Sequence, residues 1–276
     1  MALLLLSGTA TWSASDVSPW SFWASSDDSN LTSIDHNVWG EFLEKNVHFD
    51  ESGINKVGYT NVTAADRTDL QNYIRRLSLT DPRKLRKDEQ LAYWINLYNA
   101  LTVAVVLDNP DKKSIRKMGR GLFSSGPWRD ELVEIAGQNL TLDDIEHRIL
   151  RPIWQDHRIH FAVNCASLGC PNLGIEAYTA ENAERLFNLA EHDYINHERG
   201  VRFDAAGQVH LSQIFNWYQS DFASDENELL IYLSRHHDEL ADRLRSFRGK
   251  IRYDYDWSLN ACNSDKHSEN VLSCLQ

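Results

Sequence analysis

The side chain with the most reactive chemistry in this sequence is the thiol of Cys165. It follows the apolar run 159–164 and precedes a loop of small residues that includes Ala166, Ser167 and Gly169. A nucleophilic cysteine needs a lowered pKa and access to reactants, which backbone amides or a cationic imidazole commonly supply. The end of a core strand before such a loop can provide both. The opposing interpretation is inert packing, because free cysteine is among the most buried residue types.

A candidate base precedes this cysteine in the chain. Residues 142–150 predict a short helix on which Asp143 and His147 lie one turn apart. A carboxylate at this spacing can hydrogen-bond the imidazole, fix its tautomer and raise its basicity. We therefore expect His147 to activate Cys165, with Asp143 orienting the ring. The alternative is an exposed histidine on a helix surface.

Two further polar residues could support this chemistry. Glu146 lies at the edge of the apolar face of the same helix, and we expect it to pair with Arg148 or Arg151, because a buried carboxylate requires a partner. Asn96 lies on the less bulky side of a helix predicted at 88–107 and could orient a catalytic group. Buried amides more often hold loop backbone in place, which is the structural alternative.

Cys165 has two other interpretations. With His157, His160 and Cys170 it could bind zinc, which favours closely spaced His and Cys ligands. Strand alternation argues against this, because it places His160 and Cys165 on opposite faces, and we expect neither a metal nor a cofactor. Cys165 and Cys170 could instead form a disulfide, structural or redox-active, because four intervening residues with a glycine allow closure.

The segment 88–107 predicts the helix that positions these groups. Apolar side chains cover nearly all of its faces, which is typical of a helix buried on most sides. Around it we expect further helices, a strand at 159–164 that ends at Cys165, and hairpins near 132–139 and 201–211. Because the strands come as hairpins rather than as regular βαβ units, the pattern predicts a helix-rich α+β single domain with a small, mostly antiparallel sheet.

The start of the chain indicates export. It holds an apolar run followed by small residues, which is typical of a signal peptide, although no basic residue precedes the run. We therefore expect a secreted or periplasmic protein, in which a bridge between Cys262 and Cys274 would pin the C-terminal tail. The expected order is signal peptide, linker, domain and polar tail, at residues 1–15, 16–33, 34–260 and 261–276.

The charge balance limits the partners. The chain carries 28 basic and 40 acidic residues, a net charge of −12. Nucleic acids and anionic membranes both bind basic surfaces, so neither is expected as the main partner. After the N-terminal run, no segment reaches the about 18 consecutive apolar residues of a membrane span. We expect a protein that is not integral to a membrane and that binds a small molecule or peptide.

Six segments, in order, carry a family resemblance. They lie at residues 90–102, 142–152, 158–171, 176–179, 214–218 and 255–260. Together they resemble the family catalogued as domain of unknown function 547 (DUF547), over roughly residues 34–260. The resemblance implies a layout comparable with papain- and transglutaminase-like thiol hydrolases. It also favours Cys165 as the reactive thiol, because the family pattern keeps a cysteine there more faithfully than at Cys170.

Three functions are compatible with these residues. The first is a thiol-dependent hydrolase or transferase acting on an amide or thioester, with Cys165 as nucleophile and His147 as base. The second is a non-catalytic binding or scaffold module in which the polar core residues are structural. The third is a thiol-disulfide redox protein that uses Cys165 and Cys170. A cavity that holds both Cys165 and an imidazole would favour the first function over the second.

Overall fold

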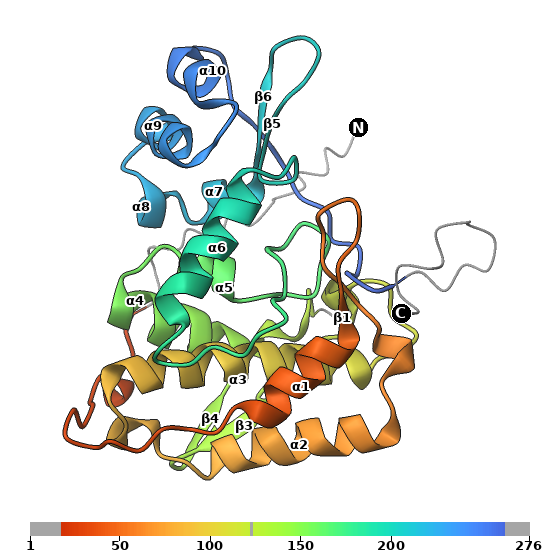
Figure 1. Ribbon diagram of the computed structural model, residues 1–276, viewed down its shortest axis with the longest axis vertical. Helices are drawn as coiled ribbons and strands as arrows, with labels where there is room; N and C mark the ends of the chain where they lie inside the picture. The colour runs from red at the N-terminus through yellow and green to blue at the C-terminus, as the bar shows by residue number, and fades with distance from the viewer. Residues whose placement is uncertain (1–17, 122–123, 263–276) are drawn as a thin grey trace, which may run out of the picture.

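Helix α3, Lys87–Leu107, runs through the middle of the fold (Figure 1). Almost every residue from Glu89 to Leu107 is buried, on all faces of the helix. A helix that is apolar nearly all round is stable only when other elements pack on all sides of it. The helix expected at 88–107 is therefore confirmed as the core of the fold.

Among the described residues, α3 is also the one helix that is long and apolar enough to cross a membrane. Its most apolar window, however, is 89% buried inside the protein. The apolar surface of α3 is thus covered by the rest of the fold, which is the behaviour of a core helix.

The computed structural model describes residues 18–121 and 124–262. The signal peptide expected at 1–15 and most of the tail expected at 261–276 lie outside these ranges. The bridge expected between Cys262 and Cys274 also involves a residue outside them.

Short helices and strands surround α3. The other α-helices are α1 Asn37–Asn46, α2 Ala64–Ser78, α4 Arg151–Trp154, α5 Ile159–Ala162, α6 Ala183–Ile195, α7 Gln213–Trp217, α8 Gln219–Phe222, α9 Glu226–His236 and α10 Ala241–Ser246. The 3-10 turns are η2 Ser21–Trp23, η3 Tyr59–Asn61, η4 Pro82–Lys84, η5 Ile115–Lys117 and η6 Pro127–Arg129, and η7, Asp144–Leu150, is a π-helix. The strands are β1 Val47–His48, β2 Lys56–Val57, β3 Val133–Ile135, β4 Gln138–Leu140, β5 Val201–Phe203, β6 Val209–Ser212 and β7 Arg252–Asp254.

These elements form two packed regions. In Figure 1, α2 lies below α3, and α5 and α6 lie above it. The larger core gathers around α3, whereas a second core around Phe161, Phe215 and Leu229 joins α5, α7 and α9. Helix α2 begins at a capping box in which Thr63 and Asp66 satisfy each other's backbone N–H groups.

The strands form three small sheets, β1–β2, β3–β4 and β5–β6–β7. Val133 pairs with Leu140 and Val201 pairs with Leu211, so both expected hairpins are confirmed. Strands β6 and β7 run parallel, whereas the other pairs of described strands are antiparallel. The helix-rich α+β fold with small, mostly antiparallel sheets is thereby confirmed.

The strand expected at 159–164 is wrong. Residues Ile159–Ala162 form the helix α5, and the chain becomes extended at Val163. A short apolar run cannot be assigned to strand or helix by periodicity alone, because every side of it is buried in either case. The argument from strand alternation that separated His160 from Cys165 therefore does not apply.

The described part of the segment expected as a linker at 16–33 contacts the domain. The Trp23 ring is buried and packs edge-on against Trp94 of α3, with centroids 5.1 Å apart. The backbone N–H of Trp20 donates to the carbonyl of Arg148 at 2.9 Å. Two tryptophans therefore attach this polar segment to the domain, although its composition is that of a linker.

Candidate active site

Cys165 lies on a loop, residues 163–170, that buried amide side chains hold in place. Asn99 of α3 accepts the backbone N–H of Asn164 at 2.8 Å. The Asn164 side chain accepts the N–H of Ala166 at 2.8 Å and donates to the carbonyl of Pro171 at 2.6 Å. Ala166 has a φ of 58°, in the left-handed region that non-glycine residues rarely adopt. The chain therefore turns sharply just after Cys165, and we call this segment the Cys loop.

Residues 255–260, which we call the C-terminal segment, pack against the other side of the Cys loop. The N–H of Leu168 donates to Ser258, and that of Gly169 donates to the carbonyl of Asp256 at 2.9 Å. A Cβ atom on Gly169 would lie 2.8 Å from the backbone nitrogen of Asp256. The close approach therefore requires glycine, and it brings Tyr255 against the loop.

The Cys165 sulfur is surrounded by hydrogen-bonding groups. Its Sγ lies 3.2 Å from the hydroxyl of Ser167 and 3.1 Å from that of Tyr255. Its backbone N–H donates to the Sγ of Cys170 at 2.9 Å. The two cysteines are free thiols.

These neighbours separate the pKa values of the two thiols. Hydrogen bonds from Cys170 first, and also from Ser167 and Tyr255, lower the pKa of Cys165 although burial opposes them. Burial and the adjacent Cys165 sulfur raise the pKa of Cys170 well above its ordinary value. Cys165 is therefore the thiol that ionises first, and Cys170 is a protonated donor beside it.

Helix η7 carries the other expected residues. Thr141 and Asp144 form reciprocal side-chain to backbone hydrogen bonds at its start, and its apolar residues are buried in the core around α3. The short helix expected at 142–150 is confirmed, but it is wound as a π-helix, a rare form that is frequent at functional sites. Asp143, Glu146 and His147 lie on the side of this helix that faces a cavity.

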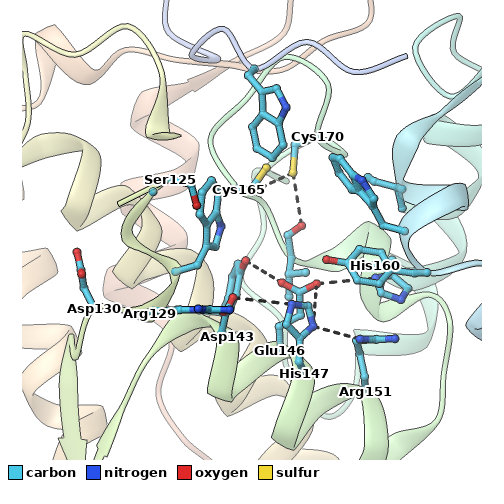
Figure 2. A pocket seen from close by; sticks show the side chains of 18 of the residues that line it. Ser125, Arg129, Asp130, Asp143, Glu146, His147, Arg151, His160, Cys165 and Cys170 are labelled. Carbon is cyan, nitrogen blue, oxygen red and sulfur yellow. Dashed lines mark hydrogen bonds and ion pairs between the residues drawn. The ribbon is translucent and has the colours of Figure 1, made fainter. Parts of the chain in front are cut away.

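The cavity has a volume of about 660 Å³ and lies between η7 and the Cys loop. Figure 2 shows the sulfurs of Cys165 and Cys170 on one side of it and the polar side chains of η7 on another. Its aromatic lining comes from Tyr98, Trp128, Trp217, Tyr218, Tyr255 and Trp257. The fold thus brings Cys165, Asp143, Glu146 and His147 into one cavity, together with Cys170.

His147 is held by two neighbours on η7 and α4. Its Nδ1 lies 3.2 Å from a guanidinium nitrogen of Arg151, and its Nε2 lies 3.9 Å from a carboxylate oxygen of Asp143. Burial, and then the charge of Arg151, lower the pKa of His147 to about 4. Because a guanidinium only donates, Nδ1 is an acceptor and the ring hydrogen is on Nε2, which faces Asp143.

This geometry changes the role expected for His147. Its pairing with Asp143 is present, but the ring is neutral at physiological pH rather than cationic. The hydrogen bonds described for the Cys165 thiol go to Ser167, Tyr255 and Cys170, and not to His147. None of these hydrogen bonds would therefore let a cationic His147 activate the Cys165 thiol.

Glu146 is buried but has a different partner from the one expected. Its Oε2 accepts the hydroxyl of Tyr98 at 2.9 Å, and its Oε1 lies 3.9 Å from Nδ1 of His160. Arg148 pairs instead with Asp144 at 2.7 Å, and Arg151 pairs with a carboxylate of α8. The expected Glu146–arginine pair is wrong, because Tyr98 of the core helix reaches Glu146 from the buried side.

His160 connects this cluster to α8. Its Nε2 lies 2.8 Å from Asp221, which also accepts a hydrogen bond from Arg151 at 2.7 Å. Burial alone would raise the pKa of Asp221, but these two hydrogen bonds lower it overall. The His160 ring also stacks on Tyr218 with centroids 4.3 Å apart. Asp221 and Tyr218 were not expected in the site, since no local pattern relates them to His160.

The zinc interpretation has no support in the described residues, where no group of three or more His, Cys, Asp or Glu side chains could hold a metal ion. His157 binds Glu191 at 2.8 Å, whereas His160 binds Asp221. Each histidine therefore contacts its own carboxylate, and the two do not share a metal ion with the cysteines.

Asn96 does not line the cavity. Its amide donates to the carbonyl of Tyr178 at 2.7 Å and accepts the N–H of the same residue at 3.0 Å. Asn99, one turn further along α3, is the amide that positions the Cys loop. Asn96 therefore has the structural role of fixing loop backbone, and the orienting role belongs to Asn99.

Residues 82–195 match the model of a family described as protein of unknown function, DUF547. The expected family resemblance is confirmed there. The DUF547 match includes α3, η7 and the Cys loop, and so covers both sides of the cavity. No curated protein and no solved structure matches the chain. The layout shared with papain- and transglutaminase-like hydrolases thus stays a prediction.

Part of the site lies outside the DUF547 match. Tyr255 and Trp257 follow β7, and Trp217 ends α7. The alternation of aromatic residues over 251–257 is a local signal that these side chains share a face. It does not reveal that the face covers Cys165, since the contact joins segments 90 residues apart.

Proposed function

We propose that this protein is a thiol-dependent hydrolase or transferase that acts on an amide or thioester, with Cys165 as the nucleophile. The observation that carries the proposal is the environment of its sulfur. Three donors lower the pKa of Cys165, and the sulfur lines a cavity large enough for a small substrate. A thiolate in an accessible cavity is the reactive form of cysteine.

The reaction would proceed in two acyl-transfer steps. The Sγ thiolate of Cys165 attacks the acyl carbonyl carbon, an S–C bond forms, and the bond to the leaving amine or thiol breaks. Water or an acceptor then attacks the thioester, the S–C bond breaks and the thiolate is regenerated. The first step delivers a proton to the leaving group, and the second step releases one from the attacking nucleophile.

Asp143 is suited to carry this proton. Burial raises the pKa of Asp143 although His147 and Arg129 oppose the shift, so a larger fraction is protonated near neutrality. As the acid it would protonate the leaving group, and as the carboxylate it would accept the proton of water, which restores the starting state. His147 would be a positioning residue, with its Nε2–H directed to Asp143.

Acyl-enzyme formation tests the proposal directly. The protein is incubated with an acyl thioester of N-acetylcysteamine, and its intact mass is measured with time. We expect a mass increase equal to the acyl group on the wild type and none on Cys165→Ser. Asp143→Asn should accumulate the acyl-enzyme, because water then attacks without a base.

The competing functions give different results in the same experiment. A binding module would show no acyl adduct at any time, which would refute the proposal. A redox protein would instead react with oxidised glutathione and form a Cys165–Cys170 bridge, while leaving the thioester intact. Alkylation of Cys165 by iodoacetamide at a pH below ~8.5, the pKa of free cysteine, would show directly that its thiolate is present.

A further inference from the structure

A run of cations leads along the chain to Arg120, which lines the cavity, although the chain as a whole is acidic. Five side chains of the segment 112–120 are exposed, and none is ion-paired with a carboxylate among the described residues. We call them the basic rim, and they are Lys112, Lys113, Arg116, Lys117 and Arg120. In a protein with a net charge of −12, such a local excess of positive charge requires an explanation.

The basic rim is fixed in place against the Cys loop. Ile115 and Met118 are buried in a small apolar cluster that includes Ala166, the residue that follows Cys165. The carbonyl of Lys113 accepts the N–H of Leu259 at 3.0 Å. The segment therefore presents its charges at a defined position, with its apolar side chains on the loop that carries the thiol.

Two side chains connect the basic rim to the cavity. Arg120 lines the cavity itself, and the Arg116 guanidinium lies 5.3 Å from the centroid of the Trp257 ring, which also lines it. A guanidinium on an aromatic face keeps its hydrogen-bond donors available at the edge. Arg120 is thus part of the cavity wall, and Arg116 lies against an aromatic ring of that wall.

The carboxylates near the basic rim do not cancel its charge. Asp111 precedes it, Asp130 accepts the backbone N–H of Arg120, and Asp256 lies in the C-terminal segment beside the Cys loop. Inside the cavity, Arg129 and Asp143 face each other. The five cations of the basic rim outnumber the three carboxylates near it, whereas the charged residues that line the cavity itself are balanced, three cations against three carboxylates.

We infer that the basic rim binds an anionic group, a phosphate or a carboxylate, on the acyl donor, and so places the acyl group beside Cys165. The inference deepens the proposed function and rests on it for the identity of the acyl donor. Positive charge at a cavity mouth raises both the association rate and the local concentration of anions. The aromatic walls beyond it would take the acyl part, because they offer apolar surface next to the sulfur.

Paired alkylating reagents test the charge at the site. Iodoacetate and iodoacetamide react with the same thiolate, but only iodoacetate is an anion. We measure the ratio of their rate constants at Cys165 in the wild type, in K113Q/R116Q/K117Q and in the control R75Q/K84Q/R235Q. The control removes three exposed cations that have no ion pair with a described residue and lie in α2, η4 and α9.

We expect the iodoacetate to iodoacetamide ratio to fall several-fold in the rim variant and to stay unchanged in the control. Salt should lower the wild-type ratio, because the Debye length shrinks from about 10 Å at 0.1 M to 3 Å at 1 M. An equal ratio in all three proteins would overturn the inference. A parallel loss in the rim variant and the control would mean that net charge, rather than the basic rim, sets the ratio.

Calorimetry provides a measurement that does not need a reactive thiol. Inorganic pyrophosphate and glutarate are titrated into the wild type and the two triple variants at constant ionic strength. Binding of either anion that is lost in the rim variant alone supports the inference, and the anion that binds identifies the group. Absence of binding by both anions overturns it. If Cys165 reacts with neither iodoacetate nor iodoacetamide while an anion still binds, the proposed function is wrong. The inference that the basic rim binds anions then still holds.

Discussion

At the scale of single residues, the reactive thiol depends on hydroxyl and thiol donors rather than on a cationic histidine. Cys170, Ser167 and Tyr255 surround the Cys165 sulfur, and His147 is neutral with a pKa of about 4. Each donor stabilises the thiolate more than the thiol, because a hydrogen bond to a charged group is stronger than one to a neutral group. Thiolate formation and proton transfer are therefore assigned to separate residues.

Replacing Tyr255 by Phe should slow alkylation of Cys165 at pH 7 roughly tenfold, since a hydrogen bond to a charged group contributes about 1.5 kcal/mol. The measurement is the pH profile of iodoacetamide alkylation, which should move to higher pH. Tyr253→Phe is the matched control, because Tyr253 lies two residues away and donates to Glu226 instead. Equal profiles for the two variants would show that Tyr255 does not stabilise the thiolate.

At the scale of elements, the site is assembled by three segments that meet at the Cys loop. Helix α3 supplies Asn99 and Tyr98, η7 supplies the acid and the imidazole, and the C-terminal segment supplies Tyr255. Each is short or buried, so its position is set by what packs against it. At the contact of Gly169 with Asp256 there is no room for a Cβ atom.

Replacing Gly169 by Ala should separate the C-terminal segment from the Cys loop. The new Cβ would lie 2.8 Å from a backbone nitrogen, and such overpacking typically costs about 1–3 kcal/mol. We expect a lower free energy of unfolding in urea and slower alkylation of Cys165, as Tyr255 moves away. Gly174→Ala is the control, since its Cβ would meet one atom at 4.0 Å. If Gly169→Ala is as stable and as reactive as Gly174→Ala, Gly169 does not need to be glycine for the C-terminal segment to pack on the Cys loop.

At the scale of the whole molecule, buried neutral histidines connect stability to pH. Burial first, and then nearby arginines, lower the pKa of His36 and His147 to about 4, from an ordinary value of 6.5. Between these values the unfolded chain binds more protons than the folded protein, so the free energy of unfolding rises with pH. This contribution is complete above pH 6.5 and is lost as pH falls towards 4.

Each of these histidines should therefore contribute roughly 2 kcal/mol less stability at pH 5 than at pH 7. Urea unfolding at both pH values measures the difference, which should shrink in His36→Gln and in His147→Gln. His192→Gln is the control, because its hydrogen bond to Asp238 raises the pKa of that exposed histidine. Its removal should not shrink the difference. A pH dependence that is the same in the wild type and in His36→Gln would contradict the burial argument for His36.

The sequence by itself determined the features that depend on local periodicity and spacing. The core helix α3, both hairpins and the helix carrying Asp143 and His147 follow from patterns within about 20 residues. These patterns work because a helix or hairpin is fixed by neighbours in the chain. The reactive candidate Cys165 was also identified from its local context, as were three further residues that line its cavity.

The tertiary structure decided which groups these residues contact. Tyr255 at Cys165, Tyr98 at Glu146 and Asn99 rather than Asn96 at the Cys loop all involve partners far away in sequence. The short apolar run at 159–164 became helix because the surrounding core, rather than its own pattern, set its conformation. A buried polar group takes whichever partner the packing brings within about 3 Å, and no local pattern encodes that choice.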